Sequence, residues 1–524
     1  MQKVLTAEQV REVDRLTTER YGIPSILLME NAAHAVARVI TEKLGGSVEG
    51  KSILVLCGKG NNGGDGAALG RILELSGADV EIVLFGELSQ AHNDAKTNLI
   101  AARGIVTSFT EIADSAEWTN WWDAARKRWH VTIDAIFGSG LNRPIGGWLE
   151  PILGELIIEN TTARQFHDRL LVSMDLPSGL MADQASTPGV VFEAEVTVTF
   201  TAPKPANVLP DSYSLGGELI VADIGSPSDL VDDSDSGLFV STARAIESWL
   251  FRTDFSFGSY KNKRGHALLI AGSESYSGAA VLAGNSAMRS GVGLVTLAVP
   301  AEVKSEIAAR SLPDIIVRPI DFGGDLIAEA DAIAVGCGLD ANDPEIESFV
   351  RNILESRTKP VIVDAGALWF FNPPDGIPDA ADGQPPLILT PHEGEFMRLL
   401  GTTDKDAIKD RVAAVREFSR KHNVILVLKG ERVLIGEPGG KVVVNPTGNS
   451  GLGKAGNGDT LTGILAGFVA QAAAMKIDIF ETVVAAVYVA GLAGDIAEKK
   501  FGKRVMTASD VRECLTDAFA QIGG

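Results

Sequence analysis

The chain alternates short apolar runs, rich in β-branched residues, with longer segments whose apolar positions recur at helical spacing. This alternation is typical of α/β domains, in which helices connect the strands of a parallel sheet. A first series opens with two helical patterns at residues 7–20 and 24–44, and its expected strands are residues 52–57, 80–85, 131–137, 170–174, 196–200 and 219–224. We expect a mostly parallel, doubly wound sheet in this half of the chain.

A second series of the same kind starts near residue 240. Its expected strands are residues 267–271, 294–299, 332–335, 361–363, 387–389 and 424–428, followed by three helical patterns. The polar, acidic and turn-rich residues 226–237 separate the two series and are the best candidate for a linker. The sequence therefore predicts two α/β domains, residues 1–235 and 236–524, and no repeat relates them convincingly.

Composition narrows the setting of these domains. A chain of 524 residues with 45% hydrophobic content is too long for one ordinary core. The 47 basic and 68 acidic residues give a formal charge of −21, which argues against nucleic-acid or anionic-membrane binding. We expect small-molecule partners instead.

Three widely separated cysteines fit neither a disulfide framework nor a zinc cluster, so a reducing cytoplasm fits best. The first sixteen residues lack the apolar core of a signal peptide, and no run approaches the roughly eighteen apolar residues of a membrane span. We expect a soluble, cytoplasmic protein.

The most informative segment is TGNSGLGKAGNGDTLTGILAGF, residues 447–468. It places a glycine-rich loop and Asp459 at the start of a helix whose apolar face is Leu461, Ile464, Leu465, Phe468 and Val469. The free backbone N–H groups of Gly456, Asn457 and Gly458 favour an anion such as phosphate at that helix terminus. A carboxylate beside phosphate suggests proton transfer, with Asp459 accepting the proton of an attacking hydroxyl. An ordinary glycine-rich turn with Asp459 as a helix-start residue is an equally good interpretation of this motif alone.

A second glycine-rich loop, GKGNNGGDG, follows the first expected strand and matches the dinucleotide-binding pattern G-x-G-x-x-G. A Rossmann-type dehydrogenase site is therefore a contender. Asp65 weakens it, because this carboxylate stands where a pyrophosphate would otherwise sit. The side chains of Asn61 and Asn62 add polar groups that the tight fingerprint turn does not need.

Other polar side chains follow neighbouring strands of the first domain: Asp134, Asp175 and Ser178. The carboxyl ends of parallel strands meet at one edge of a sheet, so Asn62, Asp134 and Ser178 could converge on one cation. Oxygen ligands alone favour a hard cation over zinc. Any one of these residues could also simply satisfy its own turn.

The chain resembles the bifunctional NAD(P)H-hydrate repair enzymes over essentially its whole length. The first half carries NNGGDG, DAIFGSGLNRP and DLPSGL, starting at Asn61, Asp134 and Asp175. The second half carries GHALLIAGSESYSGAAVLA, RSGVGLVT, GCGL, PHEGEF, KG and GNGD, starting at Gly265, Arg289, Gly336, Pro391, Lys429 and Gly456. The number and order of these motifs make coincidence an unattractive explanation.

The resemblance implies an N-terminal Rossmann-like αβα epimerase domain and a C-terminal ribokinase-like αβα dehydratase domain. The substrates would be NADHX and NADPHX, reduced cofactors that carry water across a nicotinamide double bond. The first domain would interconvert the R and S hydrates, and the second would dehydrate the S form. ADP would be the phosphoryl donor, with Mg²⁺ bound to it, and would leave AMP and phosphate. We also expect a homo-oligomer.

In the first domain the resemblance assigns Asp175 as the acid or base of epimerisation. Asn62, Asp134 and Ser178 match the potassium (K⁺) ligands of the family. The hydrate-binding positions are Asn61, Asn62, Gly63, Gly64, Asp65, Gly138, Ser139, Gly140, Leu141, Asn142, Arg143, Pro144 and Asp175.

In the second domain Gly338, His392 and Asp459 match hydrate-binding positions, with Asp459 as the catalytic base. A lone histidine after a strand and a proline is otherwise more often a capping or solvated turn residue. The nucleotide-binding positions are Lys429, Gly430, Glu431, Arg432, Val433 and Gly458. Phosphorylation of the hydrate makes chemical sense because a phosphate ester leaves more readily than a hydroxyl.

Two positions depart from the family pattern. Asn457 stands where a threonine or serine is usual, so the geometry of the anion site or the choice of donor could differ. Pro205 follows Lys204 where the family commonly has a glycine, and we therefore interpret Lys204 as a solvated loop residue without a role in the site.

Three other functions compete with the repair assignment. A ribokinase-like vitamin or sugar kinase would use the same helix with Asp459, but it would not need the first domain. The first domain could also be a binding module without activity, which the carboxylates of Asp65, Asp134 and Asp175 argue against. A dehydrogenase would exchange hydride with a second substrate and would hydrolyse no nucleotide.

Overall fold

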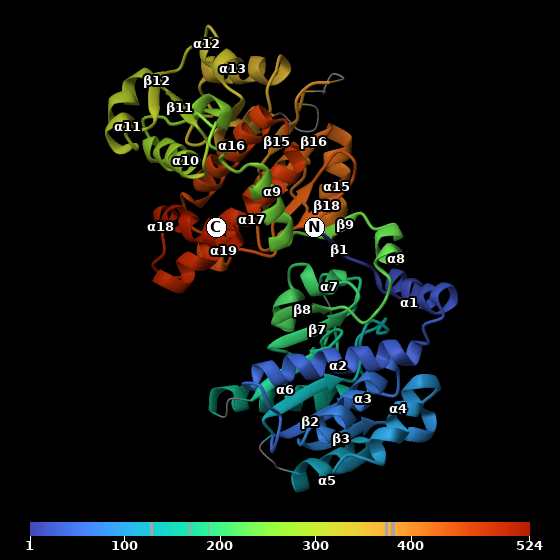
Figure 1. Ribbon diagram of the computed structural model, residues 1–524. Helices are drawn as coiled ribbons and strands as arrows, with labels where there is room; N and C mark the ends of the chain where they lie inside the picture. The colour runs from blue at the N-terminus through green and yellow to red at the C-terminus, as the bar shows by residue number, and fades with distance from the viewer. Residues whose placement is uncertain (126–128, 167–168, 187, 372–375, 379–382, 524) are drawn as a thin grey trace. The chain divides into compact units, whose positions relative to one another are not determined.

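The computed structural model describes residues 1–125, 129–166, 169–186, 188–371, 376–378 and 383–523. The chain separates into two compact units, Lys3–Ser236 and Gly237–Gly524, and Met1–Gln2 group with the second unit. Each unit is a sheet covered by helices, as Figure 1 shows along the chain. The expected fold class, two α/β domains, is confirmed.

The first unit holds a seven-stranded parallel sheet in the order β4-β3-β2-β5-β6-β7-β8. The strands are β2 (Ser52–Cys57), β3 (Asp79–Phe85), β4 (Ser108–Ile112), β5 (Val131–Ala135), β6 (Leu170–Met174), β7 (Val196–Phe200) and β8 (Glu218–Ala222). The chain builds outward from β2 in one direction and then from β5 in the other. The strand order therefore reverses between β2 and β5, and ligands usually bind in the crevice outside the carboxyl ends of the strands at such a point.

Alternating side chains of the strands point to the two faces of the sheet and pack against a separate layer of helices on each face. Ile53 and Val55 pack in one core with α2 (Ser25–Lys43), α3 (Asn61–Leu75) and α4 (Asn93–Arg103). Leu54 and Leu56 point to the opposite face and pack with α5 (Ser115–Ala125) and α6 (Leu149–Phe166). Figure 1 shows α3 and α4 together beside β2 and β3. The remaining helices are α1 (Ala7–Tyr21), α7 (Pro205–Val208) and α8 (Ser228–Asp233).

The second unit holds an eleven-stranded sheet in the order β1-β9-β18-β17-β16-β15-β14-β13-β10-β11-β12. Strands β10 to β16 are parallel, whereas β17 is antiparallel to both its neighbours. The strands are β1 (Gln2–Lys3), β9 (Leu238–Val240), β10 (His266–Ile270), β11 (Leu294–Val299), β12 (Ile316–Pro319), β13 (Ala332–Val335), β14 (Val361–Val363), β15 (Leu387–Leu389), β16 (Val424–Leu428), β17 (Leu434–Gly436) and β18 (Val442–Val444). The order reverses between β10 and β13, which places a second crevice there.

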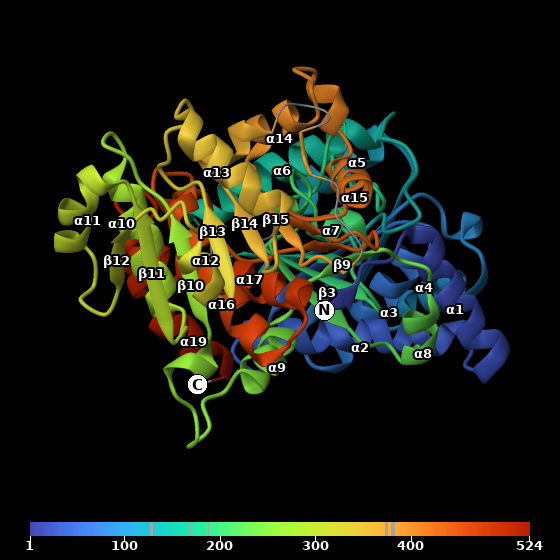
Figure 2. The same ribbon diagram turned by 90° about the horizontal axis from the view of Figure 1, so that it is seen from above.

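Helices α10 (Ser277–Arg289), α16 (Asn457–Met475) and α17 (Ile479–Phe501) cover one face of this sheet. Figure 2 shows α13 (Pro344–Glu355) and α14 (Glu393–Leu399) on the side of β13 to β15 opposite to α16 and α17. The other helices are α9 (Ala243–Arg252), α11 (Lys304–Arg310), α12 (Asp325–Glu329), α15 (Arg411–His422), α18 (Ala508–Glu513) and α19 (Leu515–Gly523). Because α16 lies between the sheet, α10 and α17, it is buried along most of its length.

The structure corrects several expectations about secondary structure. The sequence pattern missed β4 and β12, which lie at sheet edges and bury few side chains, and it missed the three-residue strands β17 and β18. The linker segment contains the short helix α8. Four helices follow residue 456 in the described chain, where three were expected.

Helix α17 corrects the expectation that no run is apolar enough to span a membrane. By length and composition α17 could cross one, but 67% of its most apolar window is buried inside the fold. Its apolar residues belong to the core that α16 and the sheet share.

Candidate functional site

The glycine-rich loop after β2 lies against the loop after β5, at the crevice of the first domain. A Cβ atom on Gly58 would lie 2.1 Å from the carbonyl oxygen of Ile136, and one on Gly63 would lie 1.7 Å from the carbonyl oxygen of Gly58. No larger side chain fits these two positions without moving backbone. Helix α3 starts directly after this loop, at Asn61.

Asp175 and Asn62 face each other across Gly138. A Cβ atom on Gly138 would lie 2.8 Å from Asp175 Oδ2 and 3.3 Å from Asn62 Oδ1. Asp175 follows β6 in a left-handed conformation with φ 66°, and its Oδ2 accepts a 2.8 Å hydrogen bond from the Ser139 backbone N–H. Three loops that are distant in sequence thus bring a carboxylate and an amide to the same place.

Asp134 is fully buried below this position. Its carboxylate accepts hydrogen bonds from the Ser178 N–H at 2.7 Å and from the Ser173 hydroxyl at 3.0 Å. Burial raises the pKa of Asp134 to about 6, against the opposing effect of its hydrogen bonds.

Neither the amide oxygen nor the amide nitrogen of Asn62 has a hydrogen-bond partner among the described residues, although both are buried. A buried carboxylate with no ion-pair partner in the described parts of the chain, next to an unpaired amide oxygen, suits an oxygen-coordinated cation. The predicted ligand set Asn62, Asp134 and Ser178 therefore fits such an ion.

Two further carboxylates, those of Asp65 and Asp14, lie near Asp175, and their pKa values are raised. Burial raises the pKa of Asp65 well above its usual value, and the negative charges of Asp175 and Asp14 add to this effect. Burial likewise raises the pKa of Asp14, on α1, to about 6. Sequence reasoning missed Asp14, because only the fold brings α1 next to this site. The arrangement favours an ionised Asp175 beside a protonated Asp65.

The interpretation of Lys204 as a solvated loop residue is wrong. The side chain is 1% exposed, and its ammonium lies 2.6 Å from Asp175 Oδ1. Burial alone would raise the pKa of Asp175, but the charge and hydrogen bond of Lys204 outweigh it and lower that pKa below its usual value. Asp175 therefore stays ionised.

The other predicted residues of the first domain surround this centre. Gly63 and Gly64 are buried in the first turn of α3, whereas Asn61 is exposed. Leu141 donates its N–H to the carbonyl of Gly138, which turns the chain after β5. The rest of this loop is exposed: Gly140, Asn142, Arg143 and Pro144.

The site of the second domain forms at the N-terminus of α16. Gly456 caps the helix in a left-handed conformation with φ 90°, and Asp459 lies in the first turn. Burial, reinforced by the negative charge of Asp364, raises the pKa of Asp459, while a hydrogen bond with Cys337 and the charge of Lys429 oppose the shift. A base with a raised pKa is a stronger proton acceptor than an ordinary aspartate.

Asp364 joins this site to Lys429. Asp364 is 1% exposed, and it accepts hydrogen bonds of 2.7 Å from the Lys429 ammonium and 2.7 Å from the Thr462 hydroxyl. A Cβ atom on Gly458 would lie 3.7 Å from Lys429 Nζ. The ammonium is thus next to the helix terminus, where an anion would bind.

Sequence reasoning missed Asp364, Cys337 and Thr462. Asp364 comes directly after β14, the same kind of position as that of Asp175 after β6 in the first domain. That signal could have identified it. No comparable sequence pattern identifies Cys337 and Thr462, because they belong to the site only through their contacts with Asp459 and Asp364.

Gly338 and His392 follow β13 and β15 on either side of Asp364. Gly338 has φ 68°, and a Cβ atom there would lie 2.6 Å from the carbonyl oxygen of Tyr276. His392 caps α14, where its Nδ1 accepts the N–H of Gly394 at 3.0 Å. Its side chain is nevertheless 62% exposed, and its Nε2 lies 3.5 Å from Glu395 Oε1.

The predicted nucleotide-binding stretch is the turn between β16 and β17. Lys429 starts it, Gly430 has φ 154°, and the carbonyl of Glu431 accepts a hydrogen bond from Arg411. Val433 ends the turn and accepts the N–H of Asn445 through its carbonyl. Arg432, with φ 53°, binds the carbonyl of Pro446.

Asn457 holds the glycine-rich loop rather than facing away from it. Its amide nitrogen donates to the carbonyl of Leu452 at 3.0 Å, and its amide oxygen is buried without a partner among the described residues. The amide of Asn457 extends further from the backbone than a serine or threonine hydroxyl, and it stabilises the loop through this hydrogen bond.

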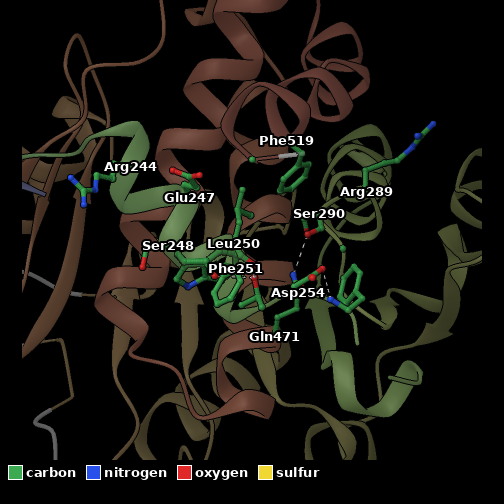
Figure 3. Close-up of a pocket in the computed structure, with 15 residues that line it drawn as sticks. Arg244, Glu247, Ser248, Leu250, Phe251, Asp254, Arg289, Ser290, Gln471 and Phe519 are labelled. Atoms are coloured by element: carbon green, nitrogen blue, oxygen red, sulfur yellow. Dashed lines mark hydrogen bonds between the residues drawn. The ribbon is translucent and has the colours of Figure 1, made fainter. Parts of the chain in front are cut away.

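A large cavity of about 690 Å³ lies elsewhere in the second domain (Figure 3). Figure 3 shows Leu250, Phe251 and Phe519 around it, with Arg289 turned away from its centre. Ser290 and Gly291, just beyond the C-terminus of α10, line this cavity, whereas the N-terminal end of α10 lies next to Gly338. A helix of this length spans about 20 Å, so the cavity is separate from the site at Asp459.

Comparisons with known proteins cover both halves of the chain. Residues 25–206 match the family described as YjeF-related protein N-terminus, and residues 267–517 match the family described as NAD(P)H-hydrate dehydratase. A bifunctional NAD(P)H-hydrate repair enzyme of Moorella thermoacetica is 36% identical, over 98% of this chain and 96% of that protein. A protein of the same name from Dictyoglomus turgidum is 31% identical over 99% of both chains.

A solved structure is also similar to the second half. It is the ADP/ATP-dependent NAD(P)H-hydrate dehydratase from Bacillus subtilis, co-crystallized with ATP and Mg²⁺, with 30% identity and a TM-score of 0.48. The similarity covers 54% of this chain and 98% of that one.

Proposed function

Because this chain belongs to the family of bifunctional NAD(P)H-hydrate repair enzymes, we propose that its two sites divide the repair of NADHX and NADPHX between them. Residues 1–235 epimerise the hydrates, and residues 236–524 dehydrate the S form with a nucleotide as phosphoryl donor. The observation that carries the proposal is the group of Asp459, Asp364 and Lys429 at the start of α16, in which Asp364 is buried and the other two are partly exposed. The presence of both domains disfavours a vitamin or sugar kinase and a simple dehydrogenase.

In the dehydratase site, Asp459 accepts the proton of the hydrate hydroxyl as that oxygen attacks the terminal phosphate of the nucleotide. The N–H of Gly458 and the ammonium of Lys429 stabilise the charge of the transferring phosphoryl group. Asp364 holds the ammonium in place. The phosphorylated oxygen then leaves with its electron pair, and loss of a proton from the neighbouring carbon restores the ring double bond.

The turn of Lys429, Gly430, Glu431, Arg432 and Val433 binds the adenine nucleotide. We propose ADP as the donor, with Mg²⁺ on its phosphates, so that the products are AMP and phosphate. Gly338 and His392, which follow the strands on either side of β14, bind the hydrate. The exposed side chain of His392 suits a hydrogen bond to the substrate.

In the epimerase site, Asp175 is the base, because Lys204 keeps it ionised. The raised pKa of Asp65 suits an acid. Asp65 protonates the hydroxyl, which leaves as water and lets the ring nitrogen stabilise the cation at that carbon. Water then adds from the other face and gives a proton to Asp175. Proton exchange between the two carboxylates resets the site.

Residues of the two loops around Asp175 bind the hydrate: Asn61, Asn62, Gly63, Gly64, Asp65, Gly138, Ser139, Gly140, Leu141, Asn142, Arg143 and Pro144. Asn62, Asp134 and Ser178 would hold a potassium ion, which supplies the missing positive charge beside Asp134. The unpaired amide oxygen of Asn62 supports this assignment.

We also propose that the protein works in the cytoplasm as a homo-oligomer that binds neither nucleic acid nor membrane. The three buried, unpaired cysteines and the net charge of −21 support the compartment and the absence of nucleic acid. Light scattering of the full chain tests the oligomer.

Recovery of NADH absorbance from mixed R and S hydrates tests the function, with ADP, with ATP and with neither nucleotide. Full recovery with ADP is the expected result. Recovery that stops at the S fraction, beyond slow spontaneous epimerisation, would mean that the first domain is inactive. No recovery with either nucleotide would contradict the repair function and favour a small-molecule kinase.

A further inference from the structure

The turn after β7 holds Asp175 through a lysine that cannot reach a substrate. Lys204 donates hydrogen bonds to Asp175 Oδ1 at 2.6 Å, to the Thr199 hydroxyl at 2.9 Å and to the carbonyl of Phe200 at 3.1 Å. A lysine ammonium has three protons, so its donors are fully used. At 1% exposure the side chain has no free surface for a ligand.

The same turn also holds the backbone of Asp175. Asn207 accepts the N–H of Lys204 through its side-chain oxygen at 2.8 Å and donates to the carbonyl of Asp175 at 3.4 Å. Pro205 is the first residue of the short helix α7, where its missing N–H costs no hydrogen bond. The departure from the family pattern at Pro205 therefore leaves Lys204 in place.

These contacts divide the two oxygens of Asp175 between different tasks. Oδ1 accepts from Lys204 and from the Thr199 hydroxyl at 3.2 Å, both behind the site. Oδ2 accepts the Ser139 N–H at 2.8 Å, and it lies beside Gly138, at the crevice. The oxygen that faces the substrate position is thus the one that Lys204 does not hold.

We propose that Lys204 is the positioning residue of the epimerase, which keeps Asp175 ionised and directs Oδ2 toward the hydrate. The inference rests on the proposed role of Asp175 as the base. A buried ion pair by itself adds little stability compared with apolar residues of the same volume. The cost of burying Lys204 is therefore better explained by catalysis than by folding.

The test is the variant Lys204→Met, which keeps the length of the side chain and removes its charge. We expect the kcat of epimerisation to fall about 100-fold, in the range of a lost acid–base contribution, with KM changed less than about twofold. The acid limb of the epimerase pH profile moves to higher pH, because Asp175 loses the charge that lowers its pKa.

Three controls separate positioning from folding. Dehydration of the pure S hydrate by the same polypeptide should be unchanged, which shows that the second domain is intact. Lys43→Met, on the partly exposed pair with Glu218, should leave epimerisation unchanged. Thr199→Val removes a hydroxyl that bridges Lys204 and Asp175 without changing charge or size, so it should lower kcat about tenfold in a folded domain.

The outcomes distinguish the inference from the proposed function. If Asp175→Asn retains full epimerisation, the assignment of the base fails, and the inference fails with it. If Asp175→Asn is inactive while Lys204→Met and Thr199→Val both keep wild-type kcat and the wild-type acid limb, only the role of Lys204 is contradicted. We expect Asp175→Asn with Lys204→Met to be no slower than Asp175→Asn alone, and a further loss would also contradict it.

Discussion

The two domains both place a lysine–aspartate ion pair at the carboxyl end of a parallel sheet, but opposite members of the pair face the site. In the first domain Lys204 is buried behind Asp175, and the carboxylate faces the glycine-rich loops. In the second domain Asp364 is buried behind Lys429, and the ammonium lies beside Gly458. The distances within the pairs are nearly equal, 2.6 and 2.7 Å.

The two ion pairs show that the same residue types can support different reactions, according to which member of the pair faces the site. An ionised carboxylate at the front of a site can accept a proton from water or a hydroxyl, whereas an ammonium at the front stabilises phosphate. The second domain needs a proton acceptor as well. Asp459 supplies it from a different element, the first turn of α16.

Substitution of Asp459 should have the largest effect on the activity of the second domain. We expect Asp459→Asn to lower the kcat of dehydration about 10³-fold, because an amide cannot accept the hydroxyl proton. Recovery of NADH from the pure S hydrate with ADP measures it. Epimerisation should be unchanged, as should dehydration by the control Asp340→Asn, at an exposed position. A loss below about tenfold would show that another group is the base.

Removal of the Lys429 ammonium, which faces the site, should have the next largest effect. Lys429→Met should lower the kcat of dehydration about 100-fold, because the transferring phosphoryl group loses a preorganised positive charge. Single-turnover kinetics with ADP separate this loss from weaker nucleotide binding. Lys421→Met changes an exposed lysine of α15 and should have no effect. Loss through KM alone would contradict a role in the transition state.

Removal of the carboxylate behind the ammonium should have a smaller effect and a definite pH signature. Asp364→Asn is expected to lower the kcat of dehydration about tenfold, because Lys429 keeps its charge but loses its anchor. Asp459 acts in its ionised form, and its pKa is raised, so activity on acidification is lost at a higher pH than for an ordinary aspartate.

The substitution of Asp364 removes a negative charge that contributes to this shift. The pKa of Asp459 should therefore fall, and the acid limb of the dehydratase profile should move to lower pH. A limb that stays in place or moves to higher pH would contradict the assignment of Asp459 as the titrating base.

The smallest expected effect concerns the glycine-rich loop of the first domain. Gly58→Ala should destabilise that domain by about 2 kcal/mol, because the new methyl group would overlap the carbonyl of Ile136. Gly60→Ala is the matched control, since a Cβ atom there meets nothing within 4 Å. Chemical denaturation followed by tryptophan fluorescence measures both. Equal stabilities would contradict the tight packing of this loop.

Much of the fold was predictable because central strands bury both faces. The patterns at residues 52–57, 170–174 and 294–299 match β2, β6 and β11 at both ends. Edge strands are half exposed and lack this signal, which is why β4 and β12 were missed. The glycine-rich loops and strand-end carboxylates were also visible, since parallel sheets bind ligands where their strands end.

The sequence by itself determined the two α/β domains, their family, and the residues that stand at strand ends and helix starts. Local pattern and motif are enough for these. Only the tertiary structure decided which charges meet. Lys204 looked solvated because a turn after a strand is usually exposed, yet β6 and β7 bring it within 2.6 Å of Asp175. Asp14 likewise takes part only through contacts between distant segments, and no local pattern records the burial that raises its pKa. Asp364 stands at a strand end, but only the fold brings Lys429 to it.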